Sequence, residues 1–177
     1  MIYVGLVFVC VISILIILTI VFYNKFRLAI IKIDEAENNI DILFEKKIQL
    51  LERARTIIKK ELKLKEFLDD IDFLNESAIN HFEMNNSLKN IHCELNKTLD
   101  EHEKLFKSEA LLSVMDDLRG NDEEILGSTK FYNDNVVLFN QLVDSFPSRL
   151  VAVIFRYKRK EFYNNEKREM YEILNDK

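Results

Sequence analysis

The sequence predicts an all-α protein, in which an N-terminal single transmembrane helix continues into an antiparallel bundle of long helices with a short C-terminal helix. Only three glycines and one proline occur in 177 residues, which leaves few of the turns that β-strands need. Apolar residues recur three and four positions apart over most of the chain, as in helices with one buried face. A long uncharged apolar stretch at the N-terminus supplies the membrane helix.

Residues 1–23 form the first predicted domain. Ile2 to Tyr23 is a stretch of 22 residues without a charge. A helix of this length rises about 33 Å and crosses a hydrocarbon core about 30 Å thick. A cleaved signal peptide is the competing interpretation, but no cationic segment precedes the stretch and no small-residue cleavage site follows it. We therefore expect the lipid bilayer to surround residues 2–23.

The residues after this stretch predict its orientation. Lys25, Arg27 and Lys32 all come before the first acidic residue, Asp34. Because positive charge next to a span favours the cytoplasmic side, we expect residues 24–177 to form a cytoplasmic bundle on a single-pass protein of the cell membrane.

Two apolar faces are expected to pack in the first part of this bundle. The first lies on the helix that leaves the membrane and has apolar residues seven apart, at Leu43, Leu50, Ile57 and Leu64. The second face consists of Phe67, Ile71, Leu74, Ala78, Phe82, Leu88, Ile91, Leu95, Leu99 and Phe106. Adjacent asparagines in MNNS (84–87) favour a kink or short loop. The bundle therefore has three long helices, or four if the second is split near Asn85 and Asn86.

A third face runs from Leu111 to Phe146 and is apolar or aromatic at every position except Asp122 and Thr129. Its positions alternate four and three apart, and the register continues through RGNDEE (119–124), which favours one long helix over a stop and restart. Gly120 and Gly127 lie seven apart and are expected to allow a neighbouring helix to approach closely.

Asp122 falls on this apolar face. A buried aspartate must be paired, so one interpretation is a contact with a basic residue that sets the register. The other interpretation is exposure at an end of the bundle, which we expect here because aspartate is rarely fully buried.

The long helix is expected to end at Phe146, because Pro147 cannot donate a helical hydrogen bond and disfavours helical geometry in the residue before it. SRLVAVIF (148–155) then forms a short helix, which opens a basic aromatic tail at 148–177. The candidate interaction or membrane-surface residues in this tail are Arg149, Arg156, Tyr157, Lys158, Arg159, Lys160, Phe162 and Tyr163.

The number of long helices decides where this tail lies. Three long helices place Pro147 at the end of the bundle away from the membrane, where the tail caps the bundle or recruits a partner. A true turn at MNNS would instead bring the tail near the bilayer, where its cations meet anionic headgroups. We expect the first arrangement, because the second face loses little periodicity at MNNS.

No catalytic, cofactor-binding or metal site is predicted. His81 and His92 lie about 16 Å apart along a helix, too far to share a metal, and neighbouring residues such as His92 and Cys93 do not face each other. We expect solvated histidines, a buried Cys93 and no disulfide, because Cys10 lies in lipid. A net charge of -5 argues against binding of nucleic acid.

The C-terminal third resembles a known family. FYNDNV, then LFNQLVDSFPSRLVA and a basic stretch that ends in EFY, is similar to the C-terminal signature of the LemA family, carried here by Tyr132, Asn133, Phe146, Pro147 and Ser148. A Pro-Asn pair common in that family is absent near Glu52, where the chain reads LLERA. The resemblance implies a bacterial single-span membrane protein with a helical bundle and no established reaction.

Two functions fit these features. The first is a membrane-anchored helical interaction or scaffold protein without catalytic activity, with an unidentified protein partner and the option of a homo-oligomer through its heptad-like faces. The second is a lipid-binding or membrane-organising protein that acts through the basic aromatic C-terminal segment.

Overall fold

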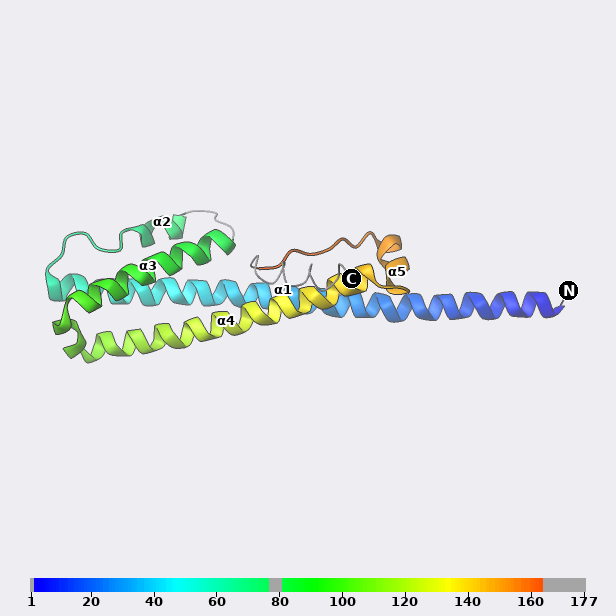
Figure 1. Ribbon diagram of the computed structural model, residues 1–177, viewed down its shortest axis with the longest axis horizontal. Coiled ribbons are helices and arrows are strands. Elements are labelled where there is room, and N and C mark those ends of the chain that lie inside the picture. Colours follow the sequence, from blue (N-terminus) through cyan, green and yellow to red (C-terminus); the bar gives the residue numbers. More distant parts are fainter. Residues whose placement is uncertain (1, 77–80, 164–177) are drawn as a thin grey trace. The chain divides into compact units, whose positions relative to one another are not determined.

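A computed structural model describes residues 2–76 and 81–163, and every regular element within these ranges is a helix (Figure 1). The elements are α1 (Ile2–Leu62), α2 (Asp70–Glu76), α3 (His81–Glu101), the 3₁₀ helix η1 (Glu103–Lys107), α4 (Glu109–Asp144) and α5 (Ser148–Phe155). The all-α prediction is confirmed. The chain divides into two compact units, unit 1 (residues 1–36 and 131–177) and unit 2 (residues 37–130).

Helix α1 continues from the apolar stretch into the bundle without a break, as predicted. It is long and apolar enough to cross a membrane: its most apolar window has a mean hydropathy of 3.2, and none of that window is buried. The helix ends at Leu62, and the next residue, Lys63, has a φ of 53°. A residue in this left-handed conformation is a common way to stop a helix.

Unit 2 has a core made by three helices. Side chains with almost no solvent exposure come from α1, α3 and the first part of α4, and include Leu51, Ile58, Leu88, Leu95, Leu111 and Leu118. Each fully buried leucine or isoleucine contributes about 1.5–3 kcal/mol to the stability of the unit. Of the first predicted face, Leu43 and Leu50 are buried, but Leu64 is 41% exposed, and Ile58 is fully buried in place of Ile57.

The alternative of a split near Asn85 and Asn86 does not occur, because α3 runs through both residues, as we expected. The preference of asparagine for turns costs only a few tenths of a kcal/mol in a helix, and burial of Leu88, Ile91 and Leu95 outweighs it. The second predicted helix is instead divided into α2 and α3, and the chain also leaves the helical conformation at residues 63–69, where Leu68 has a positive φ. Ala78 and the side chains of His81 and Phe82, which the sequence analysis also used, lie outside the described residues.

Helix α4 spans RGNDEE without interruption, which confirms one long helix. The expected close approach at its glycines is wrong: a Cβ atom built on Gly120 or Gly127 meets nothing within 4 Å among the described residues. The glycines therefore do not make room for a neighbour.

Unit 1 packs α5 against α1 and α4. Its buried cluster joins Phe26, Ala29 and Ile33 of α1 to Val136 and Phe139 of α4, and adds Val151 and Ala152 of α5. Within this unit α4 runs back along α1, and its end lies beside the start of the bundle part of α1 (Figure 1).

The prediction of a tail far from the apolar stretch is therefore wrong. The ring of Phe155 lies 4.9 Å from that of Tyr23, which is the last residue of the apolar stretch. The physical reason is that the second predicted helix is divided into α2 and α3, which lie side by side in unit 2 (Figure 1) and add a return of the chain that apolar periodicity did not reveal. With this additional return of the chain, Pro147 lines the same cavity as Phe22 and Lys25 of α1, where the apolar stretch ends.

Candidate functional site

Residues 157–163 form an extended segment, the strap, that docks on α4. Asn140 holds the main chain of Lys160 on both sides: its Nδ2 donates to the carbonyl oxygen (2.9 Å), and its Oδ1 accepts from the N–H (2.8 Å). Asn133 Oδ1 accepts from the N–H of Tyr163 at 2.8 Å. Two side chains seven residues apart on one helix face therefore fix an irregular segment in place.

The aromatic residues of the strap pack onto the helices. The ring of Tyr157 lies 4.7 Å from Phe26 and 6.0 Å from Phe139, and Phe162 packs against the same cluster. The rings of Tyr163 and Tyr132 are 6.0 Å apart. These aromatic side chains therefore anchor the strap.

The five cations in the described part of the tail, residues 148–163, fall into two groups. Arg159 contacts both carboxylate oxygens of Asp144, at 3.0 and 2.9 Å, and Lys160 Nζ lies 3.4 Å from Asp34. Arg149, Arg156 and Lys158 are exposed, and they form no ion pair with any residue that the structure describes. The three cations in this second group are available to an external anion.

The FPS segment of the predicted signature makes a corner. The axis of α5 is bent by 93° from that of α4, and the Phe146–Pro147 peptide bond is cis. Ser148 is buried, and its hydroxyl donates to the carbonyl oxygen of Ser145 at 2.8 Å. Phe146 was predicted as the last residue of the buried face, but 82% of it is exposed. The change of direction at this corner places Phe146 beyond the end of the buried core.

Asp122 has two partners in unit 2. Its Oδ1 accepts from Lys47 Nζ at 2.6 Å, and its Oδ2 lies 3.1 Å from Nδ1 of His92. The expectation of exposure at an end of the bundle is wrong, and the alternative of a pairing contact is right. The side chain of Lys47 is only 7% exposed, so the carboxylate of Asp122 offsets the cost of burying its ammonium group.

The pKa of Asp122 is below its ordinary value. Partial burial alone would raise the pKa, but hydrogen bonds from His92 and Lys47, together with their charge, outweigh it. The ionised carboxylate is therefore the form that the folded chain favours.

The expectations for His92 and Cys93 are wrong, because His92 is paired and Cys93 is exposed. Both errors have one cause, since adjacent helical residues point about 100° apart and only one of them can face the core. His102 Nδ1 lies 3.1 Å from the carbonyl oxygen of Thr98. No group of three or more metal-ligating side chains occurs among the described residues.

The sequence analysis named Asn133 only as part of the family resemblance, and it did not identify the buried asparagines Asn121, Asn135 and Asn140. Asn121 Nδ2 donates to the carbonyl oxygen of Leu43 at 3.1 Å, while its Oδ1 is buried without a partner in the described structure. The sequence did indicate that Asn133 and Asn140 share one face of a helix, because they lie seven residues apart. Composition alone does not tell which main-chain groups they bind.

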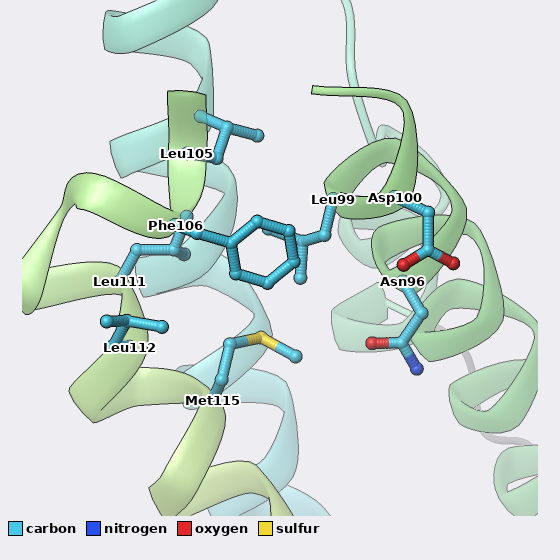
Figure 2. Close-up of a pocket in the computed structure, with 8 residues that line it drawn as sticks. All are labelled: Asn96, Leu99, Asp100, Leu105, Phe106, Leu111, Leu112 and Met115. Carbon is cyan, nitrogen blue, oxygen red and sulfur yellow. The ribbon is translucent and has the colours of Figure 1, made fainter. Parts of the chain in front are cut away.

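A hollow of about 330 Å³ lies in unit 2 where η1 joins α3 to α4. Figure 2 shows Phe106 of η1 reaching toward Leu99 of α3, with Met115 of α4 beside it and Asp100 at the edge. Phe106 and Leu112 are exposed, although the sequence analysis placed Phe106 on a buried face. The hollow offers an apolar surface with a polar edge.

Comparison with known proteins gives one match. The model of the LemA family matches residues 37–173, which is most of the chain. No curated protein and no solved structure matches.

Proposed function

Because the chain belongs to the LemA family, we propose that it is a membrane-anchored helical scaffold without catalytic activity, which presents its bundle to a protein partner. The observation that carries this proposal is the continuity of α1. One unbroken helix bears the exposed apolar stretch and then contributes Phe26, Leu51 and Ile58 to the buried cores. A partner bound to the bundle is thereby coupled to the membrane through a helix rather than a loose linker.

Residues 2–23 are the proposed span and the bilayer is the first partner. The proposed orientation places the bundle in the cytoplasm of a single-pass protein in the cell membrane. Lys25, Arg27 and Lys32 support it through the preference of cations for the cytoplasmic side.

The native cysteines test this orientation. Cys93 is exposed on α3, whereas Cys10 lies in the proposed span. In intact cells a membrane-impermeant maleimide is expected to leave Cys93 unlabelled, and to label it once the membrane is permeabilised. A Cys93→Ser variant identifies the labelled residue. Labelling of Cys93 in intact cells would show that the bundle faces outward.

The hollow in unit 2 is the proposed contact for the protein partner. Its exposed apolar side chains, Phe106 and Leu112, lie beside Asp100, a combination that suits an apolar anchor residue with a hydrogen-bonding rim. Apolar side chains with a polar residue at their edge are more typical of the centre of a protein–protein interface than of a surface that contacts only water.

Site-specific photo-crosslinking tests this contact in the full-length chain. A photoreactive residue at Leu112 is expected to capture one discrete protein in cells, and Phe106→Asp is expected to reduce that product several-fold, because the charge disrupts an apolar contact. Leu126 is the matched control, since it is also an exposed leucine of α4 in unit 2 but does not line the hollow. Equal capture from both positions, or capture of a second copy alone, would contradict a partner at the hollow.

Lipid binding through the C-terminal segment is the second candidate function. It is favoured by the position of α5 and the strap beside Tyr23 and Phe26, next to the end of the proposed span. The three tail cations without ion pairs within the described residues support it further.

A further inference from the structure

Helix α5 is apolar on two opposite faces. Val151 and Ala152 are buried in the cluster of unit 1. At about 100° per residue, Leu150, Val153 and Ile154 lie on the other side of the helix, and they are 55%, 70% and 66% exposed. A helix that is apolar all round is normally covered on every side, so the outer face of α5 lacks its cover in the isolated chain.

The place of α5 along α1 indicates what covers it. Phe155, at its end, contacts Tyr23. At its start, Phe146, Pro147 and Ser148 line a cavity of about 430 Å³ together with Phe22, Lys25 and Leu28 of α1. Both ends of α5 thus lie at the level of α1 residues 22–28, where the apolar stretch ends. That level is the boundary between hydrocarbon and headgroups for a span of this length.

The direction of α5 also fits this boundary. Helix α4 runs back along α1 in unit 1, and α5 is bent by 93° from α4 (Figure 1). The short helix therefore lies across the direction of the proposed span, roughly in the plane of the membrane. Amphipathic helices that bind bilayers lie in this plane with their apolar side chains in the acyl boundary.

The charges around α5 fit anionic headgroups. Arg149, Arg156 and Lys158 are exposed and form no ion pair with the described residues, and Lys25 Nζ lies over the ring of Phe22, 5.3 Å from its centre. Arg159 and Lys160 are held by carboxylates of the chain itself. The free cations thus gather where α5 and the span meet.

We propose that α5, with Phe146, is a second membrane contact: it lies in the interface of an anionic bilayer beside the span. Phe146, Leu150, Val153 and Ile154 enter the acyl boundary, and Arg149, Arg156 and Lys158 bind lipid phosphates. This inference rests on the span of the proposed function, but it needs no protein partner. It also differs from lipid binding by the aromatic residues of the strap, which pack inside unit 1.

As the cover of the outer face of α5, a bilayer is favoured over a second protein, because the span holds α5 at a fixed level relative to the membrane surface. In every copy the span brings the membrane surface to residues 22–28 of α1, so the outer face of α5 meets lipid without a further binding event. The apolar face and the cations thus have one occupant that carries both acyl chains and phosphate.

The chain contains no tryptophan, so a single introduced one reports its own surroundings. The full-length Ile154→Trp variant is reconstituted in vesicles of phosphatidylcholine and phosphatidylglycerol, with bromine near the top of the acyl chains as a quencher. Its emission is expected to shift to shorter wavelength, and the brominated lipid is expected to remove most of it. Leu126→Trp, also at an exposed apolar site, is expected to emit at long wavelength without quenching.

The other outcomes are decisive. Long-wavelength emission without quenching from Ile154→Trp would overturn the proposal, and a short-wavelength shift without quenching would show that protein covers α5. Leu15→Trp, near the middle of the span, tests the span separately: if lipid brominated near the ends of its acyl chains does not quench it, the span itself is wrong. Equal quenching of Ile154→Trp in purely zwitterionic vesicles would overturn the assignment of the cations to anionic headgroups.

Discussion

Replacing Asp122 by alanine is expected to lower the free energy of unfolding by about 3 kcal/mol, because it leaves the buried ammonium of Lys47 without its carboxylate. Thermal unfolding of the full-length chain in a mild detergent, followed by circular dichroism, measures this as a loss of about 9 °C in Tm. Asp116→Ala is the matched control on the same helix. Its pair with Arg119 is exposed on both sides, so we expect a change of less than about 1 kcal/mol.

The double variant Lys47→Met with Asp122→Ala tests the cause. It removes the unpaired charge, so it is expected to recover at least half of the lost Tm. A double variant as unstable as the sum of the two single variants would show that the pair is not coupled.

Acid provides a second check on the same pair. The pKa of Asp122 is lowered in the folded chain, so its contribution is present above the pKa of a free carboxyl, about 4, and is lost as the pH falls through the lower folded value. The difference in Tm between the wild type and Asp122→Ala is therefore expected to narrow in acid. A difference that stays constant from neutral pH to strongly acidic pH would contradict this role.

Replacing Asn140 by alanine is expected to release the strap from α4. The substitution leaves both the N–H and the carbonyl group of Lys160 without their partner, at a cost of about 2 kcal/mol. The detached state then becomes about thirtyfold more populated. Limited digestion with trypsin, followed by mass spectrometry, measures this as faster appearance of the fragment that begins at Glu161, because cleavage follows the open population.

Asn38→Ala is the control for this variant, because Asn38 is an exposed asparagine of α1 in unit 2. Its digestion is expected to match that of the wild type. If Asn140→Ala is also cut at the wild-type rate, the aromatic contacts and the ion pairs of Arg159 and Lys160 hold the strap without the asparagine.

Several features of this protein follow from local sequence. The apolar stretch from Ile2 to Tyr23 and the spacing of Leu43 and Leu50 need no partner to be recognised, because length and helical period are properties of a single helix. The same holds for the continuity of α4 through Gly120, where the unbroken register outweighed a local stop signal. All-α class and the family signature around Pro147 were therefore accessible from the sequence.

The tertiary structure alone decided the direction of the chain and the partners of its polar groups. The division of the second predicted helix into α2 and α3 does not interrupt the apolar spacing, yet it reverses the direction of the chain, and α5 lies beside Tyr23. The pairing of Asp122 with Lys47 and the hold of Asn140 on Lys160 join residues 75 and 20 positions apart. Periodicity describes one helix at a time, whereas these contacts depend on how separate helices meet in space.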